Sequence, residues 1–152
     1  MTGVLILDKP AGFTSFDAVA VCRRLCHERK IGHTGTLDPM ATGVLPLLLG
    51  KATRAASLLE DTDKEYEAGF RLGVSTDTED STGKVLETSD TPVSRELLES
   101  LLPRFRGEIM QVPPMYSAVS KDGKRLYELA RKGIEVEREA RPVTIFKLEL
   151  ME

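Results

Sequence analysis

Long apolar runs are missing from this sequence of 152 residues. No stretch approaches the roughly 20 apolar residues that a membrane-spanning helix needs. The opening MTGVLILDKP also lacks the basic segment and apolar core of a secretory signal peptide. Both absences favour a cytoplasmic protein without a membrane partner. The composition, 41% hydrophobic and 30% charged, is ordinary for one globular domain, and a chain of this length can bury a hydrophobic core.

Cysteine is scarce, with Cys22 and Cys26 as the two examples. They lie in FDAVAVCRRLCHERK, which predicts an amphipathic helix, so we expect both to be small core residues. A metal site with His27 as a third ligand lacks a second ligand pair at the usual spacing. A disulfide is disfavoured in a reducing compartment. The predicted buried face of the helix carries Phe16, Val19, Cys22, Leu25 and Cys26.

Charge is unevenly distributed along the chain. The net charge of −3 and the sequence pI of about 5.5 argue mildly against nucleic-acid binding. Residues 23–33 and 121–132, however, are rich in lysine and arginine, and residues 60–80 between them are rich in acids. Each run taken alone is typical of a solvated face. The two basic patches therefore leave nucleic-acid binding open.

The order of predicted elements favours an α+β fold with a mixed, mostly antiparallel sheet flanked by helices. Strands and helices are intermixed without a regular βαβ rhythm. The residues TSFD offer Thr14 or Ser15 as a helix N-cap. In segment 64–73, apolar side chains including Tyr66 and Phe70 occur at every second residue, a pattern that is typical of a half-buried strand. Strands are predicted at 3–10, 43–50 (or a buried turn), 64–73 and 142–150, a polar turn at 77–83, and helices after TSFD and at 51–61, 94–102 and 122–133.

The stretch KIGHTGTLDPMATGVLPLLLG places one aspartate, Asp38, between two glycine-rich turns. Gly32, Gly35 and Gly43 permit backbone conformations that are closed to other residues. Pro39 restricts Asp38 to an extended conformation. A loop of this kind holds a side chain at a defined angle. An isolated LDP is more often a turn in which the aspartate bonds only to nearby backbone.

The surroundings of Asp38 exclude several kinds of site. No second acid lies nearby in the sequence, which excludes the two-carboxylate arrangement of glycosidases. The absence of a Cys/His or Ser/His pair argues against acyl transfer. The segment DTEDSTG, residues 77–83, lacks the spacing and closing glutamate of a calcium loop, so a solvated turn is favoured. Nucleophilic or proton-transfer chemistry at Asp38 remains.

Several segments resemble, in order and spacing, the TruB family of bacterial tRNA pseudouridine synthases. They are GVLILDKPAGFTS, KIGHTGTLDPMATGVLPLLLGKAT, DKEY, RLGVSTDTEDSTG and VPPMYSAVSKDGKRLYELARKGIEVEREARPV, and they span essentially the whole chain. The resemblance implies a pseudouridine synthase fold. It also implies isomerisation of the T-loop uridine of tRNA, at conventional position 55, without cofactor or metal, and the tRNA T arm as partner.

The same resemblance assigns roles to single residues. Asp38 matches the catalytic aspartate, and His33 matches a histidine that fills the space vacated by the flipped base, although a histidine that satisfies a turn is the alternative. Tyr66 matches the tyrosine that packs against the flipped uracil and is a candidate acceptor of the C5 proton; it can also be a core aromatic. Lys9 and Pro10 match a motif that supports the active-site loop.

Residues 115–136 resemble the insertion that closes over the T arm as a thumb. Its lysines and arginines suit phosphate contacts, which carry affinity and no sequence information. We expect the segment to be mobile without RNA and to order on binding. The candidate RNA-binding residues are His33, Thr34, Gly35, Met115, Tyr116, Lys121, Lys124, Arg125 and Arg131.

The reaction that the resemblance implies explains why the loop carries a single acidic residue. Pseudouridine formation cleaves the bond from C1′ to N1, turns the base, rejoins it through C5 and removes the C5 proton. An ionised carboxylate can begin by attacking C1′, by adding to C6, or by taking a proton from C2′ to give a glycal, and the sequence leaves these routes open. The uridine must first be extruded from its loop, which costs a few kcal/mol of unstacking.

The family chain is longer than this sequence. Its GTYIR-like segment, which carries an arginine that pairs with the aspartate, and its C-terminal PUA domain have no counterpart here. We therefore expect residues 1–152 to be the N-terminal part of the catalytic domain and to be inactive alone. An exposed sheet edge after PVTIFKLEL then pairs with the missing half or with a second copy. A non-catalytic tRNA-binding half-domain and a plain interaction module are the alternatives.

Overall fold

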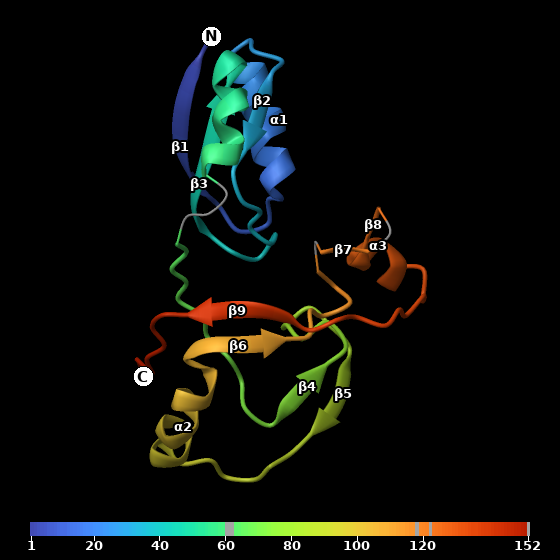
Figure 1. Ribbon diagram of the computed structural model, residues 1–152. Coiled ribbons are helices and arrows are strands. Elements are labelled where there is room, and N and C mark those ends of the chain that lie inside the picture. Colours follow the sequence, from blue (N-terminus) through green and yellow to red (C-terminus); the bar gives the residue numbers. More distant parts are fainter. Residues whose placement is uncertain (60–62, 118, 122, 152) are drawn as a thin grey trace. The chain divides into compact units, whose positions relative to one another are not determined.

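A computed structural model describes residues 1–59, 63–117, 119–121 and 123–151, with only the backbone at 121, and divides the chain into two compact units (Figure 1). The first unit is Met1–Glu67 and the second is Ala68–Glu152. Every strand pair in the described part of the chain is antiparallel. The predicted α+β class with mostly antiparallel strands is confirmed, although the strands form four small sheets.

The first unit is a three-stranded sheet with the order β1-β3-β2 and a helix packed on one face. In the sheet, β1 (Gly3–Lys9) pairs with β3 (Gly43–Leu49), which also pairs with β2 (Ile31–His33). The register places Lys9 opposite Gly43 and His33 opposite Leu47. The loop that carries Asp38 therefore connects the two paired strands β2 and β3.

Helix α1 (Ser15–Leu25) begins at a capping box. The Thr14 hydroxyl accepts a hydrogen bond from the Asp17 amide, and the Asp17 carboxylate accepts one from the Thr14 amide. The side-chain hydrogen bond from Thr14 lowers the pKa of the Asp17 carboxyl. Of the two predicted N-cap residues, Thr14 is thus the one whose side chain accepts a hydrogen bond from a free amide at the start of the helix.

One stripe of α1 packs against residues of β2 and β3 to form the core of the first unit. Cys22 is buried and Cys26 is half-buried, and both are free thiols, as expected for small core residues. Burial raises the pKa of the Cys22 thiol. Phe16 and Leu25 were predicted in the core and are instead 61% and 69% exposed, because the helical period places them beside this stripe. The buried core residues are Ala18, Val19, Cys22, Ile31, Leu45, Leu47 and Leu49.

In its described residues, the second unit contains the hairpins β4–β5 and β7–β8, the antiparallel pair β6–β9 and two short α-helices. The polar turn predicted at 77–83 connects β4 to β5, and the Asp80 carboxylate accepts hydrogen bonds within it from the Thr78 and Thr82 hydroxyls. The elements are β4 (Val74–Thr76), β5 (Val85–Thr88), α2 (Arg95–Leu101), the 3-10 helix η2 (Leu102–Phe105), β6 (Gly107–Gln111), β7 (Ser120–Lys121), β8 (Lys124–Arg125), α3 (Leu126–Ala130) and β9 (Arg141–Ile145).

Several predicted elements differ from the observed ones. The strand predicted at 64–73 is wrong: residues 63–71 form neither helix nor strand, and Tyr66 and Phe70 are each 67% exposed. Alternation of apolar and polar residues matches the two faces of a strand, but a strand also needs a neighbouring strand with which to form hydrogen bonds.

Three other elements have changed bounds or type. The helix predicted at 51–61 is the 3-10 helix η1 (Gly50–Leu59), and positions 60–61 fall outside the described residues. The helix predicted at 122–133 shrinks to α3 behind the β7–β8 turn, where Gly123 has a φ of +75° that glycine favours. The last strand ends at Ile145. In the described parts of the chain, no helix is both long and apolar enough to cross a membrane.

Candidate active site

Asp38 lies in the loop between β2 and β3, and its side chain is exposed. The loop is tied to the sheet at its start, because the Thr34 amide donates to the Pro46 carbonyl oxygen over 3.1 Å. Gly35 takes a φ of +82° and turns the chain. At the far end, the Ala41 amide donates to the Asp38 carbonyl oxygen over 3.0 Å. The Asp38 backbone is thus held in a turn while its carboxylate faces solvent.

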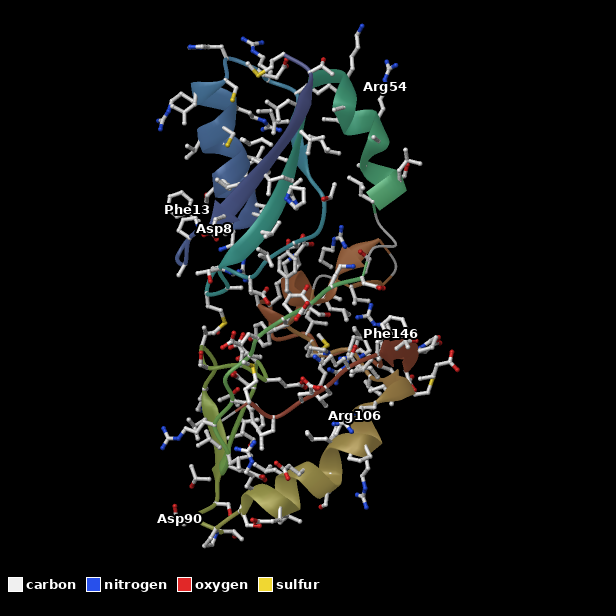
Figure 2. The ribbon with its side chains drawn as sticks, turned by 90° about the vertical axis from the view of Figure 1, so that its left-hand side faces the viewer. Asp8, Phe13, Arg54, Asp90, Arg106 and Phe146 are labelled. Atoms are coloured by element: carbon white, nitrogen blue, oxygen red, sulfur yellow. The ribbon has the colours of Figure 1, made fainter. Side chains whose placement is uncertain are left out.

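The residue after Asp38 is anchored by the turn between β1 and α1, the turn that carries Phe13 in Figure 2. The Pro39 carbonyl oxygen accepts a hydrogen bond from the Gly12 amide over 2.8 Å and a longer one from Lys9 Nζ over 3.5 Å. Lys9 is fully buried, and its ammonium also donates to the carbonyl oxygens of Pro10 and Phe13. A buried ammonium needs such acceptors to offset its lost hydration. Lys9 therefore contacts the Asp38 loop directly, and Pro10 accepts another hydrogen bond from the same ammonium.

The residue before Asp38 is anchored by Ser15. The Ser15 hydroxyl donates to the Leu37 carbonyl oxygen over 3.2 Å and accepts from the Leu37 amide over 3.0 Å. Ser15 is only 3% exposed, and the Leu37 side chain packs against the core of the first unit. The sequence analysis missed this contact. The signal was a second hydroxyl at the helix start, next to the threonine that suffices for the cap.

His33 is the last residue of β2 and is half-buried. Its Nδ1 lies 2.6 Å from the Gly35 carbonyl oxygen. A carbonyl oxygen only accepts, so Nδ1 carries a proton and, in the neutral ring, Nε2 is left as an acceptor. The imidazole is therefore oriented by the turn that starts the Asp38 loop, which is compatible with both roles considered for it.

Tyr66 lies elsewhere in the same unit. It belongs to the extended segment after η1, and its side chain is 67% exposed. The structure thus brings Lys9 and His33 into contact with the Asp38 loop, whereas Tyr66 lies on a segment that is neither helix nor strand.

Residues 115–136, which are expected to act as a thumb and are called the thumb below, belong to the second unit. Leu126 and Leu129 of α3 are buried, and the amides of Leu126 and Tyr127 donate to the Val119 and Ser117 carbonyl oxygens. Outside the thumb, Arg138 donates to the Pro113 carbonyl oxygen over 3.2 Å and so joins the chain on either side of it. The segment has a small apolar anchor of its own.

The basic residues of the thumb lie on its outside. Lys124, Arg125 and Arg131 are exposed, and the Arg131 guanidinium lies 5.4 Å from the centre of the Tyr127 ring, close enough for a cation–π contact. Met115 is half-buried and Tyr116 is 41% exposed. The Lys121 side chain is outside the described part of the structure. Across the described residues, no group of three or more His, Cys, Asp or Glu side chains could hold a metal ion.

Comparison with known proteins gives the family of this chain. Residues 23–152 match the profile described as the TruB family pseudouridylate synthase N-terminal domain. The chain is 59% identical over 149 residues to tRNA pseudouridine synthase B of Azoarcus sp. strain BH72, covering 98% of this chain and 50% of the relative. It is 55% identical over 152 residues to the protein of the same name from Pseudomonas putida strain F1, covering 100% and 50%. The chain thus spans about half the length of the curated relatives it matches.

A solved structure supports the same assignment. A chain from the crystal structure of a Cbf5-Nop10-Gar1 complex superposes with a TM-score of 0.63 at 28% identity, covering 99% of this chain and 35% of the other. The mixture of helices and antiparallel strands is therefore an incomplete pseudouridine synthase fold. The match of residues 23–152 and the identities above show that the chain belongs to the TruB family of pseudouridylate synthases.

Proposed function

We propose that residues 1–152 form the N-terminal part of the catalytic domain of a tRNA pseudouridine synthase, and that Asp38 is its catalytic carboxylate. The observation that carries the proposal is the loop geometry. Both neighbours of Asp38 are hydrogen-bonded to other parts of the first unit, through Ser15, Gly12 and Lys9, while the Asp38 side chain is exposed. Preorganised backbone with an accessible carboxylate suits a group that must meet a reacting carbon or proton at a fixed angle.

The substrate in this proposal is the T-loop uridine of tRNA at conventional position 55, flipped out of its stack. The Asp38 carboxylate begins the reaction at C1′, at C6 or at the C2′ proton, and the C1′–N1 bond breaks before the base rejoins through C5. His33, oriented by the Gly35 carbonyl oxygen, fills the space that the base leaves. Tyr66 packs against the uracil and is the candidate acceptor of the C5 proton. The overall change is an isomerisation and consumes no cofactor.

The thumb grips the T arm in the same proposal. In this proposal its exposed Lys124, Arg125 and Arg131 contact phosphates, Met115, Tyr116 and Lys121 of the same segment also contact the RNA, and Thr34 and Gly35 of the first unit contact it separately. Such contacts supply affinity that falls as salt rises. The partner of the chain in this proposal is tRNA in the cytoplasm, together with the part that corresponds to the rest of the relatives' length or a second copy of this chain.

The test uses a fusion of this chain to the second half of the Azoarcus relative, called here the full-length fusion. Asp38→Asn keeps the side chain's shape and removes its charge. We expect turnover, measured as tritium release from C5-labelled tRNA, to fall at least about a thousandfold, with tRNA binding retained on filters. The matched control is Asp90→Asn, an exposed aspartate of the second unit, which leaves turnover unchanged.

Two outcomes contradict the catalytic assignment. If Asp38→Asn keeps turnover within tenfold of the native fusion, the carboxylate does not carry the chemistry. If the native fusion binds tRNA without turnover, the chain is a tRNA-binding half-domain instead.

A further inference from the structure

Ser15 makes two hydrogen bonds with one residue, and neither serves the helix in which it lies. It is the first residue of α1, where a serine side chain commonly bonds to nearby backbone. The capping box of Thr14 and Asp17 already satisfies the start of this helix. The Ser15 hydroxyl turns instead to Leu37, 22 residues further along the chain.

This contact fixes both polar backbone groups of the residue before Asp38. A hydroxyl can donate once and accept twice, and Ser15 Oγ donates to the carbonyl oxygen of Leu37 and accepts from its amide. The pair is partly shielded from water, since Ser15 is 3% exposed and Leu37 is half-buried. Without the hydroxyl, both Leu37 groups lose their described partner at a site that is only partly open to solvent.

Asp38 is then held from two sides. Leu37 is fixed by Ser15, and Pro39 is fixed by the Gly12 amide and the Lys9 ammonium. The Pro39 ring narrows the conformations open to Asp38 itself. Of these anchors, the Ser15 side chain is the one that reaches the residue preceding Asp38.

We propose that Ser15 is a positioning residue for Asp38, acting through the backbone of Leu37. The proposal rests on the proposed function, because it assigns to Ser15 the alignment of the carboxylate that begins the reaction. Ser15 itself does not touch the substrate. Its loss leaves the carboxylate present and ionisable but no longer held at one angle, and small misplacements of a reacting group cost large factors in rate.

The experiment compares Ser15→Ala with Thr14→Ala in the full-length fusion. The two hydroxyls belong to neighbouring residues, but the Thr14 hydroxyl bonds to Asp17 to cap α1, whereas the Ser15 hydroxyl bonds to Leu37. We expect Ser15→Ala to lower kcat about 10- to 100-fold with KM within about threefold of native. We expect Thr14→Ala to weaken α1 while kcat stays within about threefold. Ser15→Cys fills the same space with a weaker hydrogen-bonding group, and its kcat should fall between those of native and Ser15→Ala.

A second readout does not depend on activity. Amide hydrogen exchange of Leu37 in the 152-residue chain should speed at least about tenfold in Ser15→Ala and Ser15→Cys, and much less in Thr14→Ala. Ser15→Cys covers the case in which the alanine variant does not fold.

The outcomes separate this proposal from the proposed function. Equal losses of kcat in Ser15→Ala and Thr14→Ala, or unchanged Leu37 exchange, overturn the positioning role even when Asp38→Asn abolishes turnover. Retained turnover in Asp38→Asn overturns the proposed function, whatever the Leu37 exchange shows.

Discussion

The ammonium nitrogen of Lys9 lies 3.5 Å from the carbonyl oxygen of Pro39, a residue 30 positions further along the chain. Shorter hydrogen bonds from the same nitrogen, of 2.9 and 2.7 Å, reach the carbonyl oxygens of Pro10 and Phe13. One fully buried cation thus joins the end of β1, the turn before α1 and the loop of Asp38. Formation of the loop is coupled to formation of the sheet.

Replacement of Lys9 should therefore destabilise the first unit. Lys9→Met keeps most of the side chain's volume but leaves three carbonyl oxygens short of a donor. We expect a loss of about 1–3 kcal/mol in the free energy of unfolding, measured by urea denaturation. The matched control is Lys51→Met, at an exposed lysine, which should change stability by less than about 0.5 kcal/mol. Equal effects of the two changes would show that the Lys9 contacts contribute nothing specific.

Gly73 should not tolerate a side chain. Its φ is +77°, and a Cβ added there would collide with the Ser89 carbonyl group, whose residue pairs back to Gly73 through the Ser89 amide. We expect Gly73→Ala to cost about 1–3 kcal/mol of stability. Gly69→Ala serves as control, because a Cβ there meets no heavy atom within 4 Å. Thermal unfolding of both variants measures the difference, and a Gly73→Ala protein as stable as the control contradicts the argument.

The Asp80 turn predicts a pH effect on stability. The hydrogen bond from the Thr82 hydroxyl, with weaker ones from the Thr78 hydroxyl and from the Thr82 and Gly83 amides, holds the pKa of the Asp80 carboxyl below its ordinary value of 3.8, against the opposing effect of burial. Because the folded-state pKa is the lower one, this carboxylate stabilises the fold fully above the unfolded-state value. The contribution is lost as pH falls through the folded-state pKa.

Carboxyl-carbon NMR tests this directly. The Asp80 titration midpoint should lie below 3.8 in the native chain and rise toward that value in Thr82→Val, which removes the hydroxyl and keeps the amide. Asp80→Asn should be less stable than native at neutral pH, with the difference shrinking below the midpoint. A midpoint that does not move in Thr82→Val shows that the hydroxyl is not the cause.

We expect the thumb to contact tRNA through basic side chains, so that tRNA binding depends on salt concentration. Lys124 is exposed on β8. Lys124→Gln removes its charge and should weaken tRNA binding by the full-length fusion. The loss of one phosphate contact should also make the slope of log affinity against log salt shallower by about 0.7–0.9. Lys84→Gln, at an exposed lysine beside β5, is the control. Filter binding at several salt concentrations gives both slopes. An unchanged slope in Lys124→Gln would remove this lysine from the proposed interface.

Local signals in the sequence predicted much of the framework. The residues TSFD placed the start of α1 at Thr14 or Ser15, the helix predicted from Ser94 is observed as α2 with Ser94 as its cap, and the glycine-bounded apolar run became β3. These features depend on neighbours within a few residues, so a linear sequence carries them. The order and spacing of the segments around Asp38 also predicted the family.

The tertiary structure decided what depends on distant parts of the chain. Phe16 fits the apolar pattern of α1 yet lies outside the core, because the sheet covers only one stripe of the helix. The alternation around Tyr66 formed no strand, since pairing requires a partner that the local sequence does not specify. The bonds from Ser15 to Leu37 and from Lys9 to Pro39 span 22 and 30 residues and end on backbone atoms. Every residue carries such atoms, so the side chains of Ser15 and Lys9 can be noticed in the sequence but their distant backbone partners cannot, and only the folded chain selects them.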